Sequence, residues 1–228
     1  MVAVYEVGGK IRDEFMGLSN KDVDYAVEAS SFEEMKEYII SENGQIYLET
    51  PEYFTIRANV NGVAADFVLC RRDGSYSDGR HPESVEIGTI YDDLARRDFT
   101  MNAIARNIKT GKIIDPFGGI SDIRRRVVRC VGKTEDRMNE DSLRILRALR
   151  FSITKNMIMN SEIGELFKSS RWMARLWLVS QERIQNELHK MFVSNTFETM
   201  RFFVENPLLA SACFSESIWL KPTSERRK

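Results

Sequence analysis

The spacing of hydrophobic and polar positions changes several times along the first half of the chain. Where apolar and polar residues alternate we expect strands, because successive side chains of a strand point to opposite faces. The strands predicted in this way cover residues 1–7, 22–27, 45–49, 53–60 and 63–70. Helical spacing predicts helices over residues 10–18 and 31–41. Asn61-Gly62 predicts a tight hairpin turn between the last two strands.

Strand patterns become rare in the second half. Residues 71–83 are polar and contain glycine and proline, which predicts a loop. Residues 90–105 predict a helix and residues 113–117 a short strand. The helices predicted beyond these cover residues 141–151, 162–169, 181–193 and 197–205. Trp172 and Trp177 are interpreted as packing among these helices.

The order of these elements predicts an α+β fold followed by a helical domain. We expect a mixed β-sheet flanked by helices, with the boundary between residues 120 and 135. The predicted division is 1–130 for the α+β head, 131–210 for an all-helical neck and 211–228 for a tail that is poorly ordered at its end. At 228 residues the chain is long enough for one large domain or two modest ones.

Composition limits the class of protein. The chain is 43% hydrophobic and 29% charged, which is typical of a globular protein. It has no apolar run of the roughly 18 residues that a membrane helix needs, so no membrane partner is expected. Cys70, Cys130 and Cys213 are far apart and match neither a disulfide framework nor a zinc-binding spacing. A reducing, cytoplasmic location is therefore expected.

The net charge of −1 does not identify a nucleic-acid-binding protein, but the arginines are clustered. The first cluster is Arg124, Arg125, Arg126 and Arg129, which we interpret as a solvated charged face. The second cluster has a spacing of three residues, which places it with an acid along one side of a helix. It comprises Asp141, Arg144, Arg147 and Arg150. Three neighbouring cations repel one another unless an anion lies alongside, and a bound nucleotide would meet that need.

The clearest candidate chemistry lies near the N-terminus. Asp22 and Asp24 are separated by one residue of a predicted strand, so both carboxylates should project from the same face. Such a pair suits Mg²⁺, which commonly binds one or two carboxylates together with substrate phosphates. Gly8 and Gly9 could bring backbone N–H groups close to those phosphates. Together these features predict a phosphoryl-transfer site.

Five motifs, in order along residues 7–188, resemble a known family. The spacing from Gly8-Gly9 to Asp22-Val23-Asp24 is similar to that of DNA polymerase β-like nucleotidyltransferases. Four later segments resemble class II tRNA nucleotidyltransferases (the CCA-adding enzymes) and the related bacterial poly(A) polymerases. These segments are RRDFTMNA at 96–103, DPFGG at 115–119 followed by Asp122-Ile123, EDSLRILRALRF at 140–151 and ERIQNEL at 182–188. The resemblance implies a polymerase β-like nucleotidyltransferase head and a helical neck.

The resemblance also assigns roles to individual residues. Asp22, Asp24 and Asp66 would be catalytic, and Asp22 and Asp24 would bind the metal. Asp66 stands where the family usually has glutamate. The nucleotide-binding residues would be Gly8, Gly9, Arg12, Arg97, Asp98, Asn102, Asp141, Arg144, Arg147 and Arg150.

Within this set the resemblance separates several tasks. Arg12 would bind phosphate, and Arg97, Asp98 and Asn102 would hold sugar and phosphates. Asp98 and Asn102 are four residues apart and are expected on one helix face. Asp141 and Arg144 would read the edge of the base. Arg147 and Arg150 would position or contact phosphates.

The predicted function is template-independent addition of C and A to the 3′ end of tRNA, from CTP and ATP, with Mg²⁺ and release of pyrophosphate. One alternative is addition of A alone, as in poly(A) polymerases. Another is a non-catalytic relative that binds RNA or nucleotides. The sequence ends about forty residues after the last motif. Family members continue through further helical domains that grip tRNA, so a homo-oligomer or a partner protein is expected to supply that surface.

Overall fold

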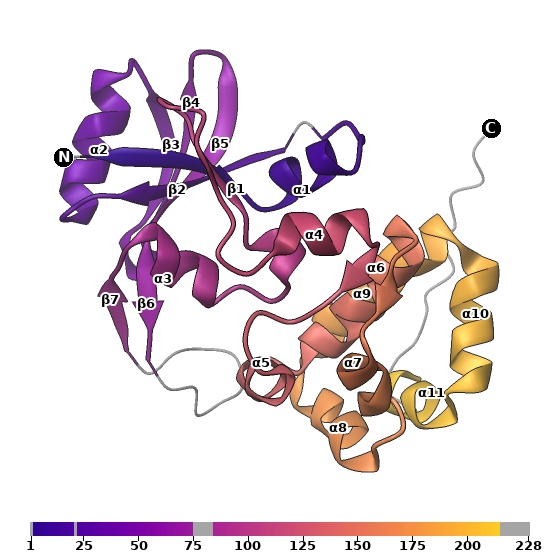
Figure 1. The fold of residues 1–228 in the computed structure, drawn as a ribbon. Coiled ribbons are helices and arrows are strands. Elements are labelled where there is room, and N and C mark those ends of the chain that lie inside the picture. Colours follow the sequence, from indigo (N-terminus) through magenta and orange to yellow (C-terminus); the bar gives the residue numbers. More distant parts are fainter. Residues whose placement is uncertain (1, 21, 75–83, 215–228) are drawn as a thin grey trace, which may run out of the picture. The chain divides into compact units, whose positions relative to one another are not determined.

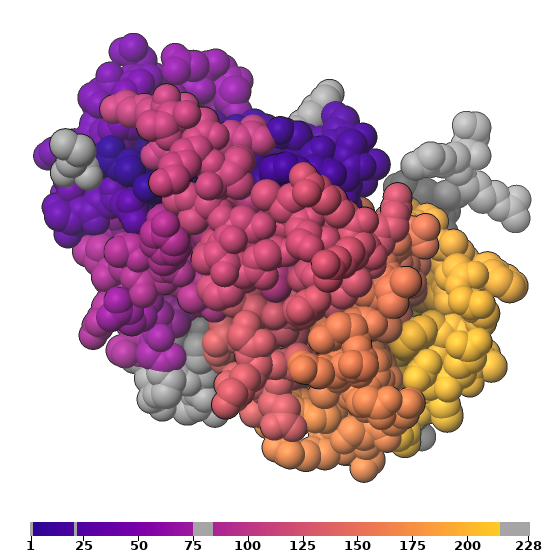
Figure 2. All heavy atoms as spheres, in the orientation of Figure 1, coloured from indigo at the N-terminus to yellow at the C-terminus, as the bar shows by residue number. Residues whose placement is uncertain are grey.

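The computed structural model describes residues 2–20, 22–74 and 84–214. The chain forms two compact units, Met1–Lys133 and Thr134–Lys228. We call the first unit the head and the second unit the neck. In Figures 1 and 2 the neck runs from rose through orange to yellow along the sequence.

The head is built on one seven-stranded sheet with the order β3-β4-β5-β2-β1-β8-β9. The sheet is mixed, because β2 and β5 run parallel whereas the other neighbouring strands are antiparallel. Its strands are β1 (Ala3–Val7), β2 (Val23–Glu28), β3 (Gln45–Thr50), β4 (Thr55–Val60), β5 (Val63–Leu69), β8 (Ala105–Asn107) and β9 (Ile113–Ile114). The predicted strands and the hairpin at Asn61-Gly62 are therefore confirmed, with ends that differ by a few residues.

Helices cover both faces of this sheet (Figure 1). On one face α2 (Phe32–Ser41) buries Phe32, Met35 and Ile39 against the strands. The Ser31 hydroxyl caps α2 by accepting a hydrogen bond of 3.0 Å from the Glu34 N–H. On the other face α3 (Ile90–Ala95) packs with Ile90 and Leu94. The remaining head elements are α1 (Gly9–Phe15), η1 (Pro51–Tyr53), β6 (Arg71–Asp73), β7 (Val85–Ile87), η2 (Thr100–Asn102), α4 (Gly119–Arg124) and β10 (Val127–Val128).

Two predictions in the head were wrong in detail. Residues 90–105 do not form one helix: α3 ends at Ala95, and Phe99 is extended with φ −126°. The Asp98 carboxylate accepts the Phe99 N–H at 2.8 Å, which replaces the hydrogen bond that a continuing helix would make. The predicted loop at 71–83 begins as a strand, because β6 pairs with β7. Residues 75–83 lie outside the described part of the chain.

The neck is mainly helical. Its elements are α5 (Thr134–Glu140), α6 (Leu143–Lys155), the two-residue strand β11 (Ile158–Met159), α7 (Ser161–Leu166), α8 (Ser170–Arg175), η3 (Leu176–Leu178), α9 (Gln181–Ser194), α10 (Thr196–Glu205) and α11 (Pro207–Cys213). The four predicted neck helices correspond to α6, α7, α9 and α10, whereas α5, α8 and α11 were not predicted. Among the described residues, no helix is long and apolar enough to cross a membrane.

Two neck predictions needed correction. Trp172 is buried as expected, but Trp177, which lies in the short turn η3 after α8, is 68% exposed. The tail predicted from residue 211 begins inside α11, where Leu209, Ala212 and Cys213 are buried. Residues 215–228 lie outside the described part of the chain.

Candidate active site

Two of the three predicted catalytic carboxylates meet in the centre of the head sheet. Asp24 on β2 lies in register with Asp66 on β5, and paired residues of neighbouring strands project from the same face. Asp22 is exposed just before β2, and its N–H donates to Asn20 Oδ1 at 3.0 Å. The parallel β2–β5 pairing thus brings together acids that are 42 residues apart in sequence.

The charges around Asp24 show what this arrangement favours. Loss of hydration raises the pKa of Asp24, and the negative charges of Asp66 and Asp22 raise it further. Arg97 and Arg57 act in the opposite direction. Like charges of this kind are relieved by a bound cation. The donors are all carboxylate oxygens, which suit a hard cation such as Mg²⁺.

A complete metal cage is not present among the residues that the structure describes. No group of three or more His, Cys, Asp or Glu side chains there could hold an ion by itself. Mg²⁺ usually keeps water ligands and binds few carboxylates beside substrate phosphates. The donor set is therefore compatible with a metal held jointly by protein and substrate.

The glycine pair lies directly beside these acids. Gly8 follows the last residue of β1 and has φ 72°, a conformation that favours glycine. A Cβ atom on Gly8 would lie 3.3 Å from Arg97 Nη1 and 3.7 Å from Asp24 Oδ2. The absence of a side chain at Gly8 thus leaves the approach between Arg97 and Asp24 open. Gly9 begins α1, one residue before the predicted start of this helix.

Arg12 joins several predicted nucleotide-binding residues in one buried network. Its Nη1 donates to Asn102 Oδ1 at 2.8 Å, and its Nε donates to Asp13 Oδ1 at 2.9 Å. Asn102 Nδ2 in turn donates to Asp98 Oδ1 at 2.9 Å. Arg12, Asp98 and Asn102 are each at most 8% exposed. Arg12 is therefore not in a surface salt bridge. Asp98 and Asn102 do meet, although through a direct hydrogen bond rather than on one helix face.

Arg97 is held by an acid that the sequence did not single out. Arg97 Nη2 donates to Asp93 Oδ2 at 2.8 Å, and Arg97 Nη1 donates to the Asn102 carbonyl at 3.3 Å. Asp93 is fully buried and also binds Arg96. Burial would raise the pKa of Asp93, but the guanidinium groups of Arg97 and Arg96 outweigh it and lower the pKa. The sequence did contain a signal for this pair, because Asp93 and Arg97 are four residues apart, the spacing at which opposite charges on a helix can pair.

Arg57 is a second residue near the acids that sequence reasoning missed. Its Nη1 lies 3.5 Å from Asp66 Oδ1. The contact follows from the hairpin, because the turn at Asn61-Gly62 sets the register that places Arg57 opposite Asp66. Extending the predicted register along both strands would have found it.

The predicted base-reading residues lie in the neck. Asp141 lies just before α6 rather than in it, and it accepts hydrogen bonds from the Leu143 N–H at 3.0 Å and from Arg183 Nη2 at 2.6 Å. Arg144 donates to Glu140 Oε2 at 2.5 Å and to the Arg137 carbonyl at 3.0 Å.

The charge argument for a nucleotide beside α6 needs correction. Arg150 pairs with Glu187, and Arg147 Nη1 lies 4.0 Å from Glu187 Oε1. Protein carboxylates, namely Glu140 and Glu187, therefore supply the anions that the arginine row requires. The nucleotide-binding role of this row remains a prediction from the resemblance alone.

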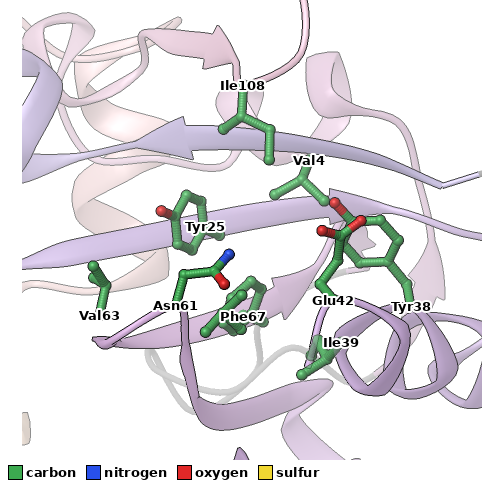
Figure 3. A pocket seen from close by; sticks show the side chains of 10 residues that line it. Val4, Tyr25, Tyr38, Ile39, Glu42, Asn61, Val63, Phe67 and Ile108 are labelled. Carbon is green, nitrogen blue, oxygen red and sulfur yellow. The ribbon is translucent and has the colours of Figure 1, made fainter. Parts of the chain in front are cut away.

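A separate hollow lies on the opposite face of the head sheet (Figure 3). It has a volume of about 210 Å³, and its floor includes Tyr25 and Phe67, whose rings stack with centroids 4.8 Å apart. Tyr25 and Phe67 each follow a site acid by one residue, so their side chains point away from Asp24 and Asp66. None of the predicted site residues lines this hollow.

Sequence comparisons place the chain among nucleotidyltransferases. Residues 4–129 match the Poly A polymerase head domain family. A CCA-adding enzyme of Streptococcus uberis is 34% identical over 203 residues, which are 88% of this chain and 48% of that protein. A CCA-adding enzyme of Geobacillus stearothermophilus is 42% identical over 148 residues, which are 64% of this chain and 35% of that protein. The chain thus spans half or less of the length of these relatives.

Solved structures show the same fold. The Bacillus stearothermophilus CCA-adding enzyme in complex with CTP is 30% identical, with a TM-score of 0.76 over 91% of this chain and 49% of that one. A tRNA nucleotidyltransferase complexed with a primer tRNA and an incoming ATP analogue is 29% identical, with a TM-score of 0.77 over 96% and 61% of the two chains. The predicted α+β head and helical neck are confirmed. The chain belongs to the Poly A polymerase head domain family of nucleotidyltransferases.

Proposed function

We propose that this chain adds C and A residues, without a template, to the 3′ end of tRNA from CTP and ATP. The observation that carries the proposal is the in-register pair Asp24–Asp66, with Gly8 and Arg97 beside it. The relatives with CCA-adding names, and the solved complexes with CTP, with an ATP analogue and with tRNA, support the choice of substrates.

Mg²⁺ is the proposed cofactor, and Asp22 and Asp24 would hold it, with Asp66 adjacent. When bound there, Mg²⁺ would favour deprotonation of the RNA 3′-hydroxyl and neutralise charge on the triphosphate. The 3′ oxygen would bond to the α-phosphorus as the bond from that phosphorus to pyrophosphate breaks. Asp66 is one methylene shorter than the glutamate usual in the family. Its position in register with Asp24 supports the assignment despite the shorter side chain.

The chain's other residues would bind and orient the nucleotide. Gly8 leaves room for a phosphate group between Asp24 and Arg97, and Arg97 carries the positive charge that this group would meet. Asp93 fixes Arg97 in place by charge-assisted hydrogen bonds. The buried network of Arg12, Asn102 and Asp98 would fix the backbone of the segment that contacts the sugar.

Base selection is assigned to the neck. Asp141 can accept a hydrogen bond from an exocyclic amine, and Arg144 can donate to ring acceptors. C and A both carry such an amine, whereas U and G lack it at that position. In the structure Arg183 and Glu140 hold these two side chains, so a bound base would have to share or replace those contacts.

The enzymatic proposal is tested with tRNA that lacks its terminal CCA. We expect the purified chain to lengthen this RNA with CTP and ATP in Mg²⁺, and to lose this activity with EDTA. Asp24→Asn should abolish extension without loss of fold, because the amide keeps the shape of the side chain but not its charge. No extension under any condition, or full activity of Asp24→Asn, would contradict the proposal.

Addition of A alone is the second candidate function. It is favoured by the name of the matched family, Poly A polymerase head domain. Labelled CTP distinguishes the two, because only the CCA-adding reaction incorporates it. A relative that binds RNA without catalysis is the third candidate, and it would be indicated if Asp24→Asn retained every RNA-dependent activity of the chain.

Two further proposals concern the setting of the protein. Cys70 and Cys213 are buried free thiols, which fits a reducing cytoplasmic location. Burial raises the pKa of Cys213 to about 12, so this thiol is unreactive at neutral pH. A second copy of the chain or a partner protein is also proposed to contribute to RNA binding.

A further inference from the structure

We propose that Arg124, Arg125 and Arg126, at the end of α4, form a binding surface for the phosphate backbone of the RNA substrate. The proposal rests on the proposed RNA nucleotidyltransferase function and assigns one of its contacts. The positive and negative charges of the whole chain are nearly balanced, with 33 Lys and Arg against 34 Asp and Glu. Residues 123–134 by contrast contain five cations and no acid, since Arg129 and Lys133 follow the three arginines.

The three arginines differ in their surroundings from the other arginines that the structure describes in the head. All three are exposed, and none forms an ion pair with any residue that the structure describes. Arg97 and Arg106, in contrast, are paired with acids, and Arg129 lies 3.0 Å from Asp122. The guanidinium groups of Arg124, Arg125 and Arg126 therefore remain available to an anion from outside the protein.

Arg126 adopts a conformation that glycine would adopt more easily. Its φ is 55°, and its N–H donates to the Ile123 carbonyl at 3.0 Å to end α4. Positions of this kind usually hold glycine or asparagine. This chain follows that rule after α1, where Gly17 has φ 72°, and after α6, where Asn156 has φ 51°. An arginine at the end of α4 thus adds backbone strain, which favours a role for its side chain.

A favourable interaction of the arginines with the C-terminal dipole of α4 is the simplest alternative. It accounts for cations in the last turn, Arg124 and Arg125. It does not account for the strained Arg126, because an arginine elsewhere in the turn would serve the dipole without a left-handed backbone.

The surface is attached rigidly to the nucleotide-binding segment of the head. Asp122 in α4 accepts a hydrogen bond of 2.7 Å from the Thr100 hydroxyl. Gly119 packs so closely that an added Cβ would lie 2.1 Å from the Thr100 carbonyl oxygen. Thr100 begins η2, which also contains Asn102 of the Arg12 network. RNA held by the arginines would therefore be held at a fixed position relative to that network.

The chemistry of the surface favours RNA over a membrane. A guanidinium group presents a planar fork of donors that matches phosphate oxygens. Membrane-binding surfaces add exposed apolar side chains to their cations. Residues 119–133 contribute no exposed large hydrophobic side chain, and Ile123 and Val128 are buried. In Figure 2 the α4 region (rose) forms part of the visible surface.

The test is the salt dependence of RNA binding by the full chain. We compare Arg124→Gln/Arg125→Gln/Arg126→Gln with a control, Arg72→Gln/Lys168→Gln/Arg201→Gln. The control removes the same charge from side chains that are 64%, 70% and 57% exposed and that each pair with an acid. Affinity for tRNA lacking CCA is measured by fluorescence anisotropy from roughly 50 to 200 mM salt, the range over which phosphate contacts weaken strongly.

We expect the arginine variant to bind RNA about tenfold more weakly at the lowest salt concentration. The slope of the logarithm of its binding constant against the logarithm of the salt concentration should shrink in magnitude by about two to three. The control should stay within about threefold of the wild type. Equal behaviour of the two variants would overturn the proposal. The proposal would also be overturned if the wild type bound phosphatidylserine vesicles more tightly than RNA and the arginine variant lost this vesicle binding. If the triple variant fails to fold, Arg124→Gln/Arg125→Gln gives the same comparison with Arg126 in place.

The outcome can be separated from that of the proposed function. If the wild type fails to extend RNA but the salt slope falls in the arginine variant, the surface stands and the enzymatic proposal fails. If the wild type extends RNA and the slope does not change, only the surface proposal fails.

Discussion

The acids of the head fall into two kinds according to their depth. Asp22 and Asp24 reach solvent, which suits groups that exchange water for a metal and a substrate. Asp93 is fully buried between two guanidinium groups and has no access to solvent. A buried acid whose partners are both cationic serves to position them, and here it positions Arg97 next to Gly8.

Asp93→Asn should lower the free energy of unfolding by about 3 kcal/mol at neutral pH, because removal of one partner leaves buried charges without compensation. The pKa of Asp93 is lowered in the folded state, so its contribution is present above the unfolded pKa of about 3.9 and is lost as pH falls through the folded value. Urea unfolding at neutral pH and near pH 3 should therefore show a difference between variant and wild type that shrinks in acid.

Asp92→Asn is the matched control for this measurement. Asp92 is the neighbouring residue, but its carboxylate only completes the capping box of α3 and pairs with Arg72. Asp92→Asn should lower the free energy of unfolding by about 1 kcal/mol. Equal losses from the two variants would contradict the positioning role of Asp93.

Single residues were predictable where a motif carried them. The glycine pair, the three aspartates and the segment from Arg97 to Asn102 follow from order and spacing along the chain. Arg57 and Asp93 were missed because their importance depends on partners, which the hairpin register and the packing of α3 supply. The carboxylate beside Arg147 and Arg150 was also missed, since Glu187 comes from α9.

At the scale of elements, the joint between α4 and η2 fixes the segment for which we propose nucleotide binding. The short turn η2 has few hydrogen bonds of its own, so its position depends on neighbours. Asp122 and Gly119 of α4 provide these contacts to Thr100. The sequence predicted one helix across this region, because it showed apolar spacing but not the competing hydrogen bond from the Phe99 N–H to Asp98.

Gly119→Ala tests this joint. The added methyl group would lie 2.1 Å from the Thr100 carbonyl oxygen, so α4 or η2 must shift. We expect the free energy of unfolding, measured with urea, to fall by about 2–3 kcal/mol. Gly164→Ala is the control, since Gly164 lies within α7 with nothing near its added Cβ, and alanine there should stabilise by up to about 1 kcal/mol. A neutral Gly119→Ala variant would refute the close packing.

The row of arginines on α6 allows a prediction about base choice. Arg144→Ala should raise incorporation of UTP relative to CTP by about tenfold, because a lost donor to the base removes discrimination. Arg147→Ala, on the same helix and 33% exposed, should slow addition without a change in base choice. Competition between labelled nucleotides measures both. Equal slowing with unchanged selectivity in Arg144→Ala would contradict its assignment to the base.

At the scale of the whole molecule, the fold class was predictable and the RNA partner was not. Alternation in the first half and helical spacing in the second half predict a head and a neck, and the solved relatives share this fold. The matched segments cover 48% and 35% of two curated relatives.

The most direct test of the central claim is the sequence of the RNA 3′ ends after reaction. tRNA lacking CCA is incubated with the chain, CTP, ATP and Mg²⁺, and the products are sequenced. We predict that C, C and A are added in that order and that Asp24→Asn adds nothing. Products that carry A alone would assign the chain to A addition. Unchanged 3′ ends with wild-type protein that binds the RNA would contradict the catalytic account.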